Sequence, residues 1–374
     1  MYRIGVIGSG HRMTPLVMKM IANEDFEVCG VCDVNIDGVR EKYAEQENVN
    51  FYTDAVEMIE SEKPDCLMIG TRCSLHTDLM VLAAKYNLPT FLEKPVCINE
   101  QQLEQLKMLK GISDRVVVSF PLRNTMLVNC VRDIIDSGKL GRIIQVQACN
   151  NVPYARVYYH DWYRDENETG GLWLQKATHD FDYINSLLGG LKPVRICASE
   201  SKQVFRGDMP AGQKCTDCPH RLTCPESDKN VATYGDRYEV NDNCCFAVDT
   251  GNHDNATAIV EYDNGVHAVY TQNFVARKGA AKRGARLIGY YGTVEFDFVT
   301  GKAHVYYHNE NKTETYEFAL GHGHSGGDDA LIKNFAAVVR GTETSRSSLD
   351  DGILSATMCL AAKRSSNEKI FCDI

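Results

Sequence analysis

The stretch "YRIGVIGSGHRM", residues 2–13, decides the fold of the first part of the chain. Its apolar, β-branched start is typical of a buried strand, and "PLVMKMIA" after it is typical of a helix. Gly8 and Gly10 match the first two glycines of G-x-G-x-x-G, which let the backbone turn tightly and approach a pyrophosphate at a helix N-terminus. Met13 occupies the third glycine position, so the motif is incomplete.

A second apolar run, "FEVCGVCD", ends in Asp33, 25 positions after Gly8. An acidic residue about 20 positions beyond the glycine turn binds the adenosine ribose in dinucleotide-binding folds. A carboxylate there also repels a 2′-phosphate, so the sequence favours NAD over NADP. A plain strand–turn–helix with an incidental Asp is the alternative. The residues expected to bind the cofactor in this part are Gly8, Ser9, Gly10, His11, Arg12 and Asp33.

Strand and helix patterns then alternate up to about residue 121. Helices are predicted near 36–46, 54–61, 76–86 and 99–111, and strands at "NFYT", "DCLMIGT", "PTFLE" and "RVVVSF". This order predicts an α/β fold with a Rossmann-type, doubly wound parallel sheet of six strands. Ligands bind at the carboxyl ends of such strands. Thr71, Arg72, Glu93 and Lys94 are predicted at these ends, although "EKP" at 93–95 could also be a surface turn.

The pattern changes after "VSFPLRNTM". A helix near 125–137, an alternating strand in "GRIIQVQACN" and a helix near 171–188 precede several strands, with "DNG" and "YGT" as hairpin turns. We therefore predict a Rossmann NAD-binding domain at 1–121. The substrate-binding α/β domain at 122–345 is expected to have a large, mostly antiparallel sheet and a cysteine-containing insert at about 201–245.

Composition limits the classes of partner. The chain has 374 residues with a net charge of −10, which argues against nucleic acid or an anionic membrane as the main partner. No run approaches the roughly 20 apolar residues of a membrane span. The N-terminus starts directly in a strand-like run without a signal-peptide pattern. We expect a cytoplasmic protein with a small-molecule partner.

Three blocks resemble the Gfo/Idh/MocA oxidoreductases, the family of glucose–fructose oxidoreductase and inositol dehydrogenase. They are "TRCSLHTDLMVLAAKYNLPTFLEKPV" (71–96), "IDSGKLGRI" (135–143) and "THDFDYINSLLGG" (178–190). The resemblance implies NAD-dependent hydride transfer at a ring carbon of a sugar, sugar acid or cyclitol. It also implies that the helix at about 348–365 packs on the first domain, and that the second sheet forms a homodimer or homotetramer.

The same resemblance implies roles for three residues. His76 would belong to the cofactor site, while Lys94 and His179 would bind substrate and move its proton. A histidine titrates near neutrality and can serve as acid or base. Sugar-oxidising relatives often carry Asp four positions before this His, but the residue here is Gln175, which cannot take a proton. Lys176 is a candidate to compensate for that loss.

Further substrate candidates come from an aromatic stretch and a Gly-rich loop. In "YYHDWYRDE" (158–166) flat aromatic faces suit a sugar ring, although interdomain packing explains them equally well. The loop "GHGHSGGDD" (321–329) is similar to a His-Gly-Gly-Asp segment near the pocket of some relatives. The full set of substrate-binding candidates is Arg123, Tyr159, Trp162, Trp173, Gln175, Lys176, His324 and Asp328.

Fifteen cysteines are many for a reduced compartment. Cys215, Cys218 and Cys224 form a C-x2-C-x5-C pattern, and a fourth thiolate could come from Cys244 or Cys245. The resemblance favours Cys245, and His220 is another possible ligand. Four thiolates around zinc would make a closed, structural site. Free thiols or an iron–sulfur cluster are the alternatives.

Three functions fit these residues. The leading one is an NAD-dependent dehydrogenase or reductase in which Lys94, aided by His179, accepts the hydroxyl proton. The second is a glycosidase that keeps its NAD and cleaves by transient oxidation and elimination. The third is a non-enzymatic NAD-dependent regulator, which we rank last because both Lys94 and His179 are present.

Overall fold

The computed structural model describes residues 1–46, 48–233 and 240–374 and divides into two compact units. The first unit comprises Met1–Thr125 and Gly321–Ala356, and the second comprises Met126–Leu320 and Thr357–Ile374. The first unit therefore includes a segment that the predicted boundary of 122–345 assigns to the other domain. Residues 234–239 of the predicted insert lie outside the described residues.

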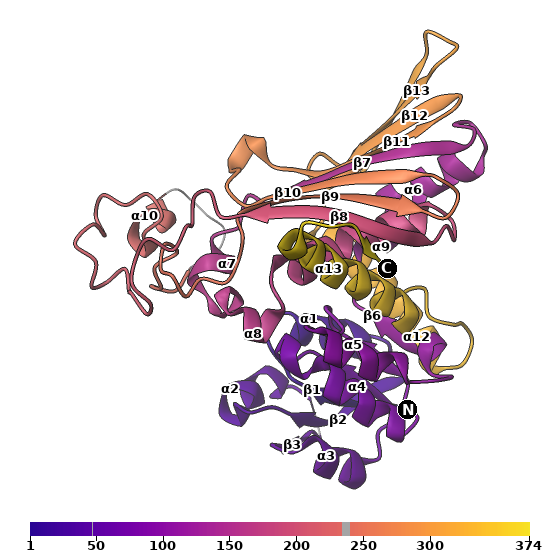
Figure 1. Cartoon of the computed structure of the whole chain (residues 1–374). Helices are drawn as coiled ribbons and strands as arrows, with labels where there is room; N and C mark the ends of the chain where they lie inside the picture. The colour runs from indigo at the N-terminus through magenta and orange to yellow at the C-terminus, as the bar shows by residue number, and fades with distance from the viewer. Residues whose placement is uncertain (47, 234–239) are drawn as a thin grey trace. The chain divides into compact units, whose positions relative to one another are not determined.

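A six-stranded parallel sheet forms the centre of the first unit (Figure 1), in the order β3-β2-β1-β4-β5-β6. Its strands are β1 (Tyr2–Ile7), β2 (Phe26–Cys32), β3 (Asn50–Tyr52), β4 (Cys66–Ile69), β5 (Thr90–Leu92) and β6 (Val116–Val118). Every residue of β4, β5 and β6 is buried. This is expected of parallel strands covered on both faces, and it explains their continuous apolar runs. The predicted Rossmann sheet is confirmed.

Helices connect and cover these strands. They are α1 (Met13–Ile21), α2 (Ile36–Arg40), α3 (Ala55–Glu62), α4 (His76–Lys85), α5 (Glu100–Lys107), α11 (His322–Ser325) and α12 (Gly327–Val339). Short polar side chains fix two of the starts: Asp54 accepts from Glu57 N before α3, and Asn99 accepts from Gln102 N before α5. Although α12 is distant in sequence, it packs with α1 and the sheet in one apolar core.

The second unit is built on a nine-stranded sheet in the order β14-β13-β12-β11-β7-β10-β9-β8-β15. Its strands are β7 (Ile143–Asn151), β8 (Pro193–Ser201), β9 (Asn255–Tyr262), β10 (His267–Asn273), β11 (Lys282–Gly289), β12 (Gly292–Asp297), β13 (Lys302–Tyr307), β14 (Thr313–Glu317) and β15 (Cys372–Asp373). All neighbours are antiparallel except β7 and β10. The predicted large, mostly antiparallel sheet is confirmed.

Helices α6 (Met126–Asp136) and α9 (Thr178–Leu187) lie on one face of this sheet (Figure 1). The sequence predicts one helix over 171–188, but the structure has a π-helical turn at Trp173–Ala177 before α9 begins. Residues 169–184 are all buried. Three short helices, α7 (Val157–His160), α8 (Glu166–Thr169) and α10 (Asp228–Thr233), lie outside the sheet region. The residues around Gln175 and His179 thus form an enclosed, non-standard helical segment.

The last helix, α13 (Leu349–Glu368), contributes residues to both units, because the division falls after Ala356. Within the second unit, Ser365 Oγ accepts from Ala198 N and Ser366 Oγ accepts from Glu200 N, which fastens the end of the helix to β8. The chain then adds β15 to the edge of β8. Among the helices in the described ranges, none has the length and apolar character needed to cross a membrane.

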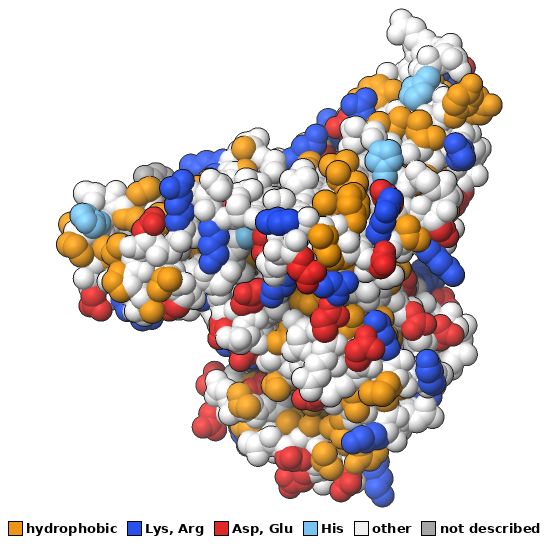
Figure 2. Space-filling model, viewed as in Figure 1, with side chains coloured by type: hydrophobic (Ala, Val, Ile, Leu, Met, Phe, Trp, Pro, Cys, Tyr) orange, Lys and Arg blue, Asp and Glu red, His pale blue; other side chains and the backbone are white. Residues whose placement is uncertain are grey.

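Acidic and basic side chains are interspersed on the face of the molecule shown in Figure 2. Neighbouring side chains of opposite charge often pair, as in Arg340–Asp25 in the first unit and Arg195–Glu261 in the second. The net charge of −10 is therefore not gathered into one acidic patch on this face.

Candidate functional site

The glycine turn after β1 has the two properties that the sequence predicts for a phosphate-binding loop. Gly8 has a φ of 79°, and a Cβ there would lie 2.8 Å from the backbone of Gly70, so only glycine fits without strain. A Cβ at Gly10 would meet nothing within 4 Å. Because helix α1 begins at Met13, this open backbone lies beside a helix N-terminus, where a phosphate is favoured.

Asp33 follows β2 and contacts the glycine turn directly. Its Oδ2 accepts from Ser9 N at 2.8 Å, and its Oδ1 accepts from Asn35 N at 2.9 Å. Lys42 Nζ donates to Ser9 O at 2.7 Å from the other side. A half-buried carboxylate therefore lies next to the open turn, as a ribose-binding acid must. These residues fit a bound dinucleotide.

His76, at the start of α4, connects the ends of two strands. Its Nδ1 lies 2.7 Å from Pro95 O, and its Nε2 lies 3.2 Å from Thr71 O. Burial lowers the pKa of His76, which favours the neutral ring. The side chain is 1% exposed, and because a neutral ring has one N–H, it can donate to one of these two carbonyl oxygens.

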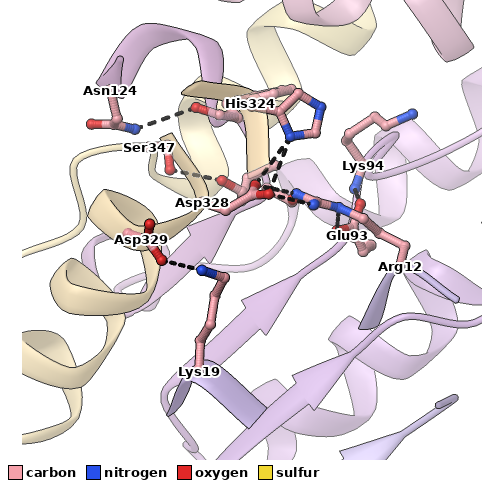
Figure 3. A network of polar contacts seen from close by, with 12 residues as sticks. Arg12, Lys19, Glu93, Lys94, Asn124, His324, Asp328, Asp329 and Ser347 are labelled. Carbon is pink, nitrogen blue, oxygen red and sulfur yellow. Dashed lines mark hydrogen bonds and ion pairs between the residues drawn. The ribbon is translucent and has the colours of Figure 1, made fainter. Parts of the chain in front are cut away.

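The Glu93-Lys94-Pro95 segment at the end of β5 is held by Arg12 of the glycine turn. Figure 3 shows the Arg12 guanidinium between Asp328 and Glu93. Arg12 donates to both oxygens of Asp328, at 2.6 and 2.8 Å, and its Nε donates to Glu93 Oε1 at 3.1 Å. Lys94 N in turn donates to Glu93 Oε2 at 3.2 Å. The Lys94 side chain extends away from these carboxylates (Figure 3), so the segment directs the amine outward.

The hydrogen bonds and charges between Arg12 and Asp328 keep both side chains ionised. Burial raises the pKa of Asp328, but the hydrogen bonds and charges of Arg12 and His324 outweigh it, and the net pKa is well below the usual range. For Arg12, burial lowers the pKa, while Asp328 and Glu93 raise it above the ordinary value. Asp328 is 2% exposed, and His324 Nδ1 lies 3.2 Å from both of its oxygens. Asp328, predicted to contact substrate, is thus positioned to orient Arg12.

Replacing Asp328 with asparagine is expected to destabilise the first unit by about 2 kcal/mol at neutral pH, because a charged hydrogen bond to Arg12 is lost. The folded pKa of Asp328 lies below its unfolded value of about 3.9, so its stabilisation is present above that value and is lost as pH falls through the folded pKa. Stability of the natural protein should therefore fall more steeply below about pH 4 than that of Asp328→Asn. Hydrogen exchange of the β1 amides measures the stability of both proteins as a function of pH. If stability falls equally steeply in both below about pH 4, the proposed ionised Asp328–Arg12 pair is contradicted.

In the second unit, the predicted residues Gln175, Lys176 and His179 occupy the π-helical turn and the start of α9 and are buried. Lys176 Nζ donates to Tyr154 Oη at 2.6 Å. Tyr154, in the segment after β7, was not predicted from the sequence, and neither was the ion pair between Asp180 and Arg283 at 2.8 Å. Only contacts between distant segments reveal these partners, because no local motif marks them.

The other substrate candidates differ in how exposed they are and in which unit they lie. Trp162 is half-buried and stacks on Tyr163, with ring centroids 4.0 Å apart. Tyr159 and Trp173 are enclosed, and their polar ends donate to His253 O and Glu200 Oε2. Both rings pack within the second unit. Arg123, in the first unit, donates to Arg346 O at 2.9 Å and pairs with Asp351.

The predicted zinc site has no support in the geometry. Over residues 1–46, 48–233 and 240–374, no three His, Cys, Asp or Glu side chains are grouped so that they could hold a metal ion. Cys245, the proposed fourth ligand, belongs instead to an apolar cluster with Tyr159 and Phe205. Burial raises the pKa of Cys215 to about 11, and it also raises the pKa of Cys245. Among the described residues, the predicted zinc site is therefore not supported.

Comparison with known families matches both units. Residues 2–119 match the domain described as "Oxidoreductase family, NAD-binding Rossmann fold" of the GFO_IDH_MocA family. Residues 132–370 match "Oxidoreductase family, C-terminal alpha/beta domain" of the same family. The two matches cover the glycine turn, the Glu93-Lys94-Pro95 segment and the helix with His179.

Individual relatives agree with these matches. The Bacillus subtilis protein YteT is 25% identical over 355 residues, covering 83% of this chain and 82% of that one. A Thermotoga maritima myo-inositol 2-dehydrogenase is 24% identical, and a Mediterraneibacter gnavus 2,7-anhydro-N-acetylneuraminate hydratase is 21% identical. These two alignments cover 50% and 54% of this chain, and 55% and 53% of the respective relatives.

Among solved structures, a levoglucosan dehydrogenase in complex with NADH and levoglucosan has a TM-score of 0.78 and 16% identity. The superposition covers 100% of this chain and 99% of that one, and at this identity it supports the fold. The domain matches extend over both units. The chain therefore belongs to the Gfo/Idh/MocA family of NAD-binding oxidoreductases.

Proposed function

We propose that this protein transfers hydride between NAD and a ring carbon of a sugar, sugar acid or cyclitol. The observation that carries the proposal is the position of Lys94. Lys94 is the second residue after β5, at the carboxyl edge of the parallel sheet, and Glu93 and Arg12 link its backbone to the glycine turn. An amine placed there suits proton transfer beside a bound nicotinamide. The names of the inositol and levoglucosan dehydrogenases support a ring substrate.

In this proposal each candidate residue has one role in binding NAD or the substrate. The turn at Gly8 and Gly10 would seat the pyrophosphate, and Asp33 would bind the adenosine ribose. When bound, NAD would supply the hydride acceptor or donor. Lys94 and His179 would hold and move the proton of the substrate hydroxyl, while Gln175 would hold a hydroxyl without accepting a proton. The carboxylate of Asp33 supports NAD over NADP.

A test is to incubate the purified protein with NAD⁺ and each of myo-inositol, scyllo-inositol and levoglucosan, and to follow NADH fluorescence. We expect oxidation of at least one ring compound, with NADP⁺ at least tenfold less effective. Asp33→Ala should reduce this cofactor preference, because the repulsion of a 2′-phosphate is removed. Tight NAD binding without oxidation of any member of a broad set of sugars, sugar acids and cyclitols would contradict the proposal.

A second candidate is a lyase-type reaction in which NAD oxidises one ring carbon only transiently. Gln175, in place of the usual Asp, and the likeness to a hydratase favour it. Oxidation at one carbon acidifies the neighbouring C–H and permits elimination. Aryl glycosides distinguish the two candidates. Aglycone release without net NADH supports the second, and NADH accumulation without aglycone release supports the first.

A further inference from the structure

Lys176 is a buried amine without a carboxylate partner among the residues that the structure describes. Its side chain is 5% exposed, and its hydrogen bond goes to Tyr154 Oη at 2.6 Å. The Nζ atom also lies 4.4 and 4.8 Å from the ring centroids of Tyr154 and Tyr158. Buried ammonium groups are normally paired with an acid. This setting therefore favours the neutral amine.

Among the described residues, the carboxylate that acts on Lys176 is that of Asp180, and it is already occupied by other donors. Asp180 Oδ1 accepts from Arg283 Nε at 2.8 Å, and Oδ2 accepts from Asn150 and Tyr270 at 2.9 and 2.8 Å. Arg283 Nη2 is buried without a hydrogen-bond partner in the described part of the chain. Since a guanidinium keeps its charge, a second cation beside it is disfavoured. Lys176 is the group that can lose its proton.

Four side chains from three parts of the second unit surround the amine: Arg283 on β11, Asp180 on α9, and Tyr154 and Tyr158 after β7. Burial and then the charge of Arg283 lower the pKa of Lys176 well below its usual value, and Asp180 only partly opposes them. A buried lysine with a lowered pKa can accept a proton at neutral pH.

Tyr154 is the member of the pair that can reach a ligand. It is half-buried, whereas Lys176 is enclosed. Lys176 directly follows Gln175 on the π-helical turn that leads to His179, so it shares a segment with predicted substrate residues, and Tyr154 is hydrogen-bonded to it. A neutral lysine amine also has a lone pair, so at 2.6 Å Lys176 Nζ can accept the phenolic proton while Tyr154 Oη accepts another proton. Tyr154 can therefore pass a proton from a ligand to Lys176.

We propose that Tyr154 and Lys176 form a proton-transfer pair for the substrate, with Tyr154 Oη at the substrate hydroxyl and Lys176 Nζ as the final acceptor. The inference rests on the proposed function. As hydride leaves the ring carbon for NAD, the substrate O–H proton passes to Tyr154 Oη. The phenolic proton of Tyr154 passes to the lone pair of Lys176 Nζ, and the ring C–O bond becomes a carbonyl. In this route Lys94 and His179 hold the substrate hydroxyl, and the Tyr154–Lys176 pair supplies the base that Gln175 cannot.

The protonation of Lys176 can be tested without any substrate, by NMR of protein labelled with ¹³C at lysine Cε. One resonance should titrate well below the other lysines and disappear in Lys176→Met. The control is Lys312→Met, because Lys312 also lies 4.5 Å from a tyrosine ring centroid, that of Tyr307, but is 50% exposed. Titration of Lys176 together with the exposed lysines would overturn the proposal, whatever the substrate is.

The second measurement is kcat and KM for the ring compound that the protein oxidises among myo-inositol, scyllo-inositol and levoglucosan. Tyr154→Phe should lower kcat on the order of 10²-fold with little change in KM. Lys176→Met should lower it similarly, and Lys176→Arg should not rescue it, because arginine stays protonated. Tyr290→Phe, at a residue 69% exposed, is the control. A kcat of Tyr154→Phe equal to that of the natural protein would overturn the proposed pair. If Lys176 titrates well below the other lysines but the protein oxidises no ring compound, only the proposed function is contradicted.

Discussion

Lys94→Ala is expected to lower turnover by at least 10³-fold while leaving NAD binding within a fewfold of the natural protein. General acid–base groups contribute about 10²–10⁴ in rate, and loss of a positioned amine adds an orientation effect. The glycine turn and Asp33 should remain intact in this variant, because it keeps the contacts of Glu93 with Arg12 Nε and with the backbone N–H of residue 94. NAD binding by calorimetry and kcat by NADH fluorescence measure the two quantities separately.

The control for this variant is Lys110→Ala, which removes an exposed lysine of the same unit after α5. Lys94→Arg adds a sharper comparison, because arginine keeps the positive charge but does not give up its proton. If Lys94 moves a proton, Lys94→Arg should be as inactive as Lys94→Ala. Recovery of activity in Lys94→Arg would mean that only the charge matters, and an active Lys94→Ala would remove Lys94 from the mechanism.

The first unit could be predicted from the sequence because its signals are local. Apolar runs that end at Gly8, Asp33, Thr71 and Glu93 place these residues at strand ends, and parallel topology brings strand ends to one edge of a sheet. Arg12 was predicted only as a cofactor residue. Its contact with Asp328, 316 positions away, depends on α12 packing against α1, and no local pattern encodes that contact.

The second unit shows where sequence patterns stop being informative. The helical pattern of residues 171–188 gives the same signal for an α-helix and for the π-helical turn that the structure contains at Trp173–Ala177. Aromatic residues such as Trp173 and Tyr159 suit both a sugar ring and a core, and only burial distinguishes these uses. The pairing of Lys176 with Tyr154 depends on the path of the chain after β7, which spacing does not determine.

Asp180→Ala is expected to destabilise the second unit by about 3–5 kcal/mol, because it leaves Arg283 as an uncompensated buried charge. Asp180 is 0% exposed and also accepts from Asn150 and Tyr270, so two further donors lose their acceptor. Urea unfolding followed by tryptophan fluorescence reports this unit, since both tryptophans, Trp162 and Trp173, belong to it. We expect a lower urea concentration at the unfolding midpoint, with an unchanged dependence of the unfolding free energy on urea concentration.

Two comparisons make the Asp180 prediction specific. Glu261→Ala breaks the Arg195–Glu261 pair, in which Arg195 is 51% exposed, and should leave the urea midpoint almost unchanged. Combining Asp180→Leu with Arg283→Met removes both buried charges and should recover much of the loss, because an apolar pair avoids the desolvation penalty. The same double variant removes Arg283, which lowers the pKa of Lys176, and Asp180, which raises it, while burial remains, so the Lys176 resonance should still titrate well below the other lysines. A cost of Asp180→Ala near that of Glu261→Ala would mean that water reaches Arg283.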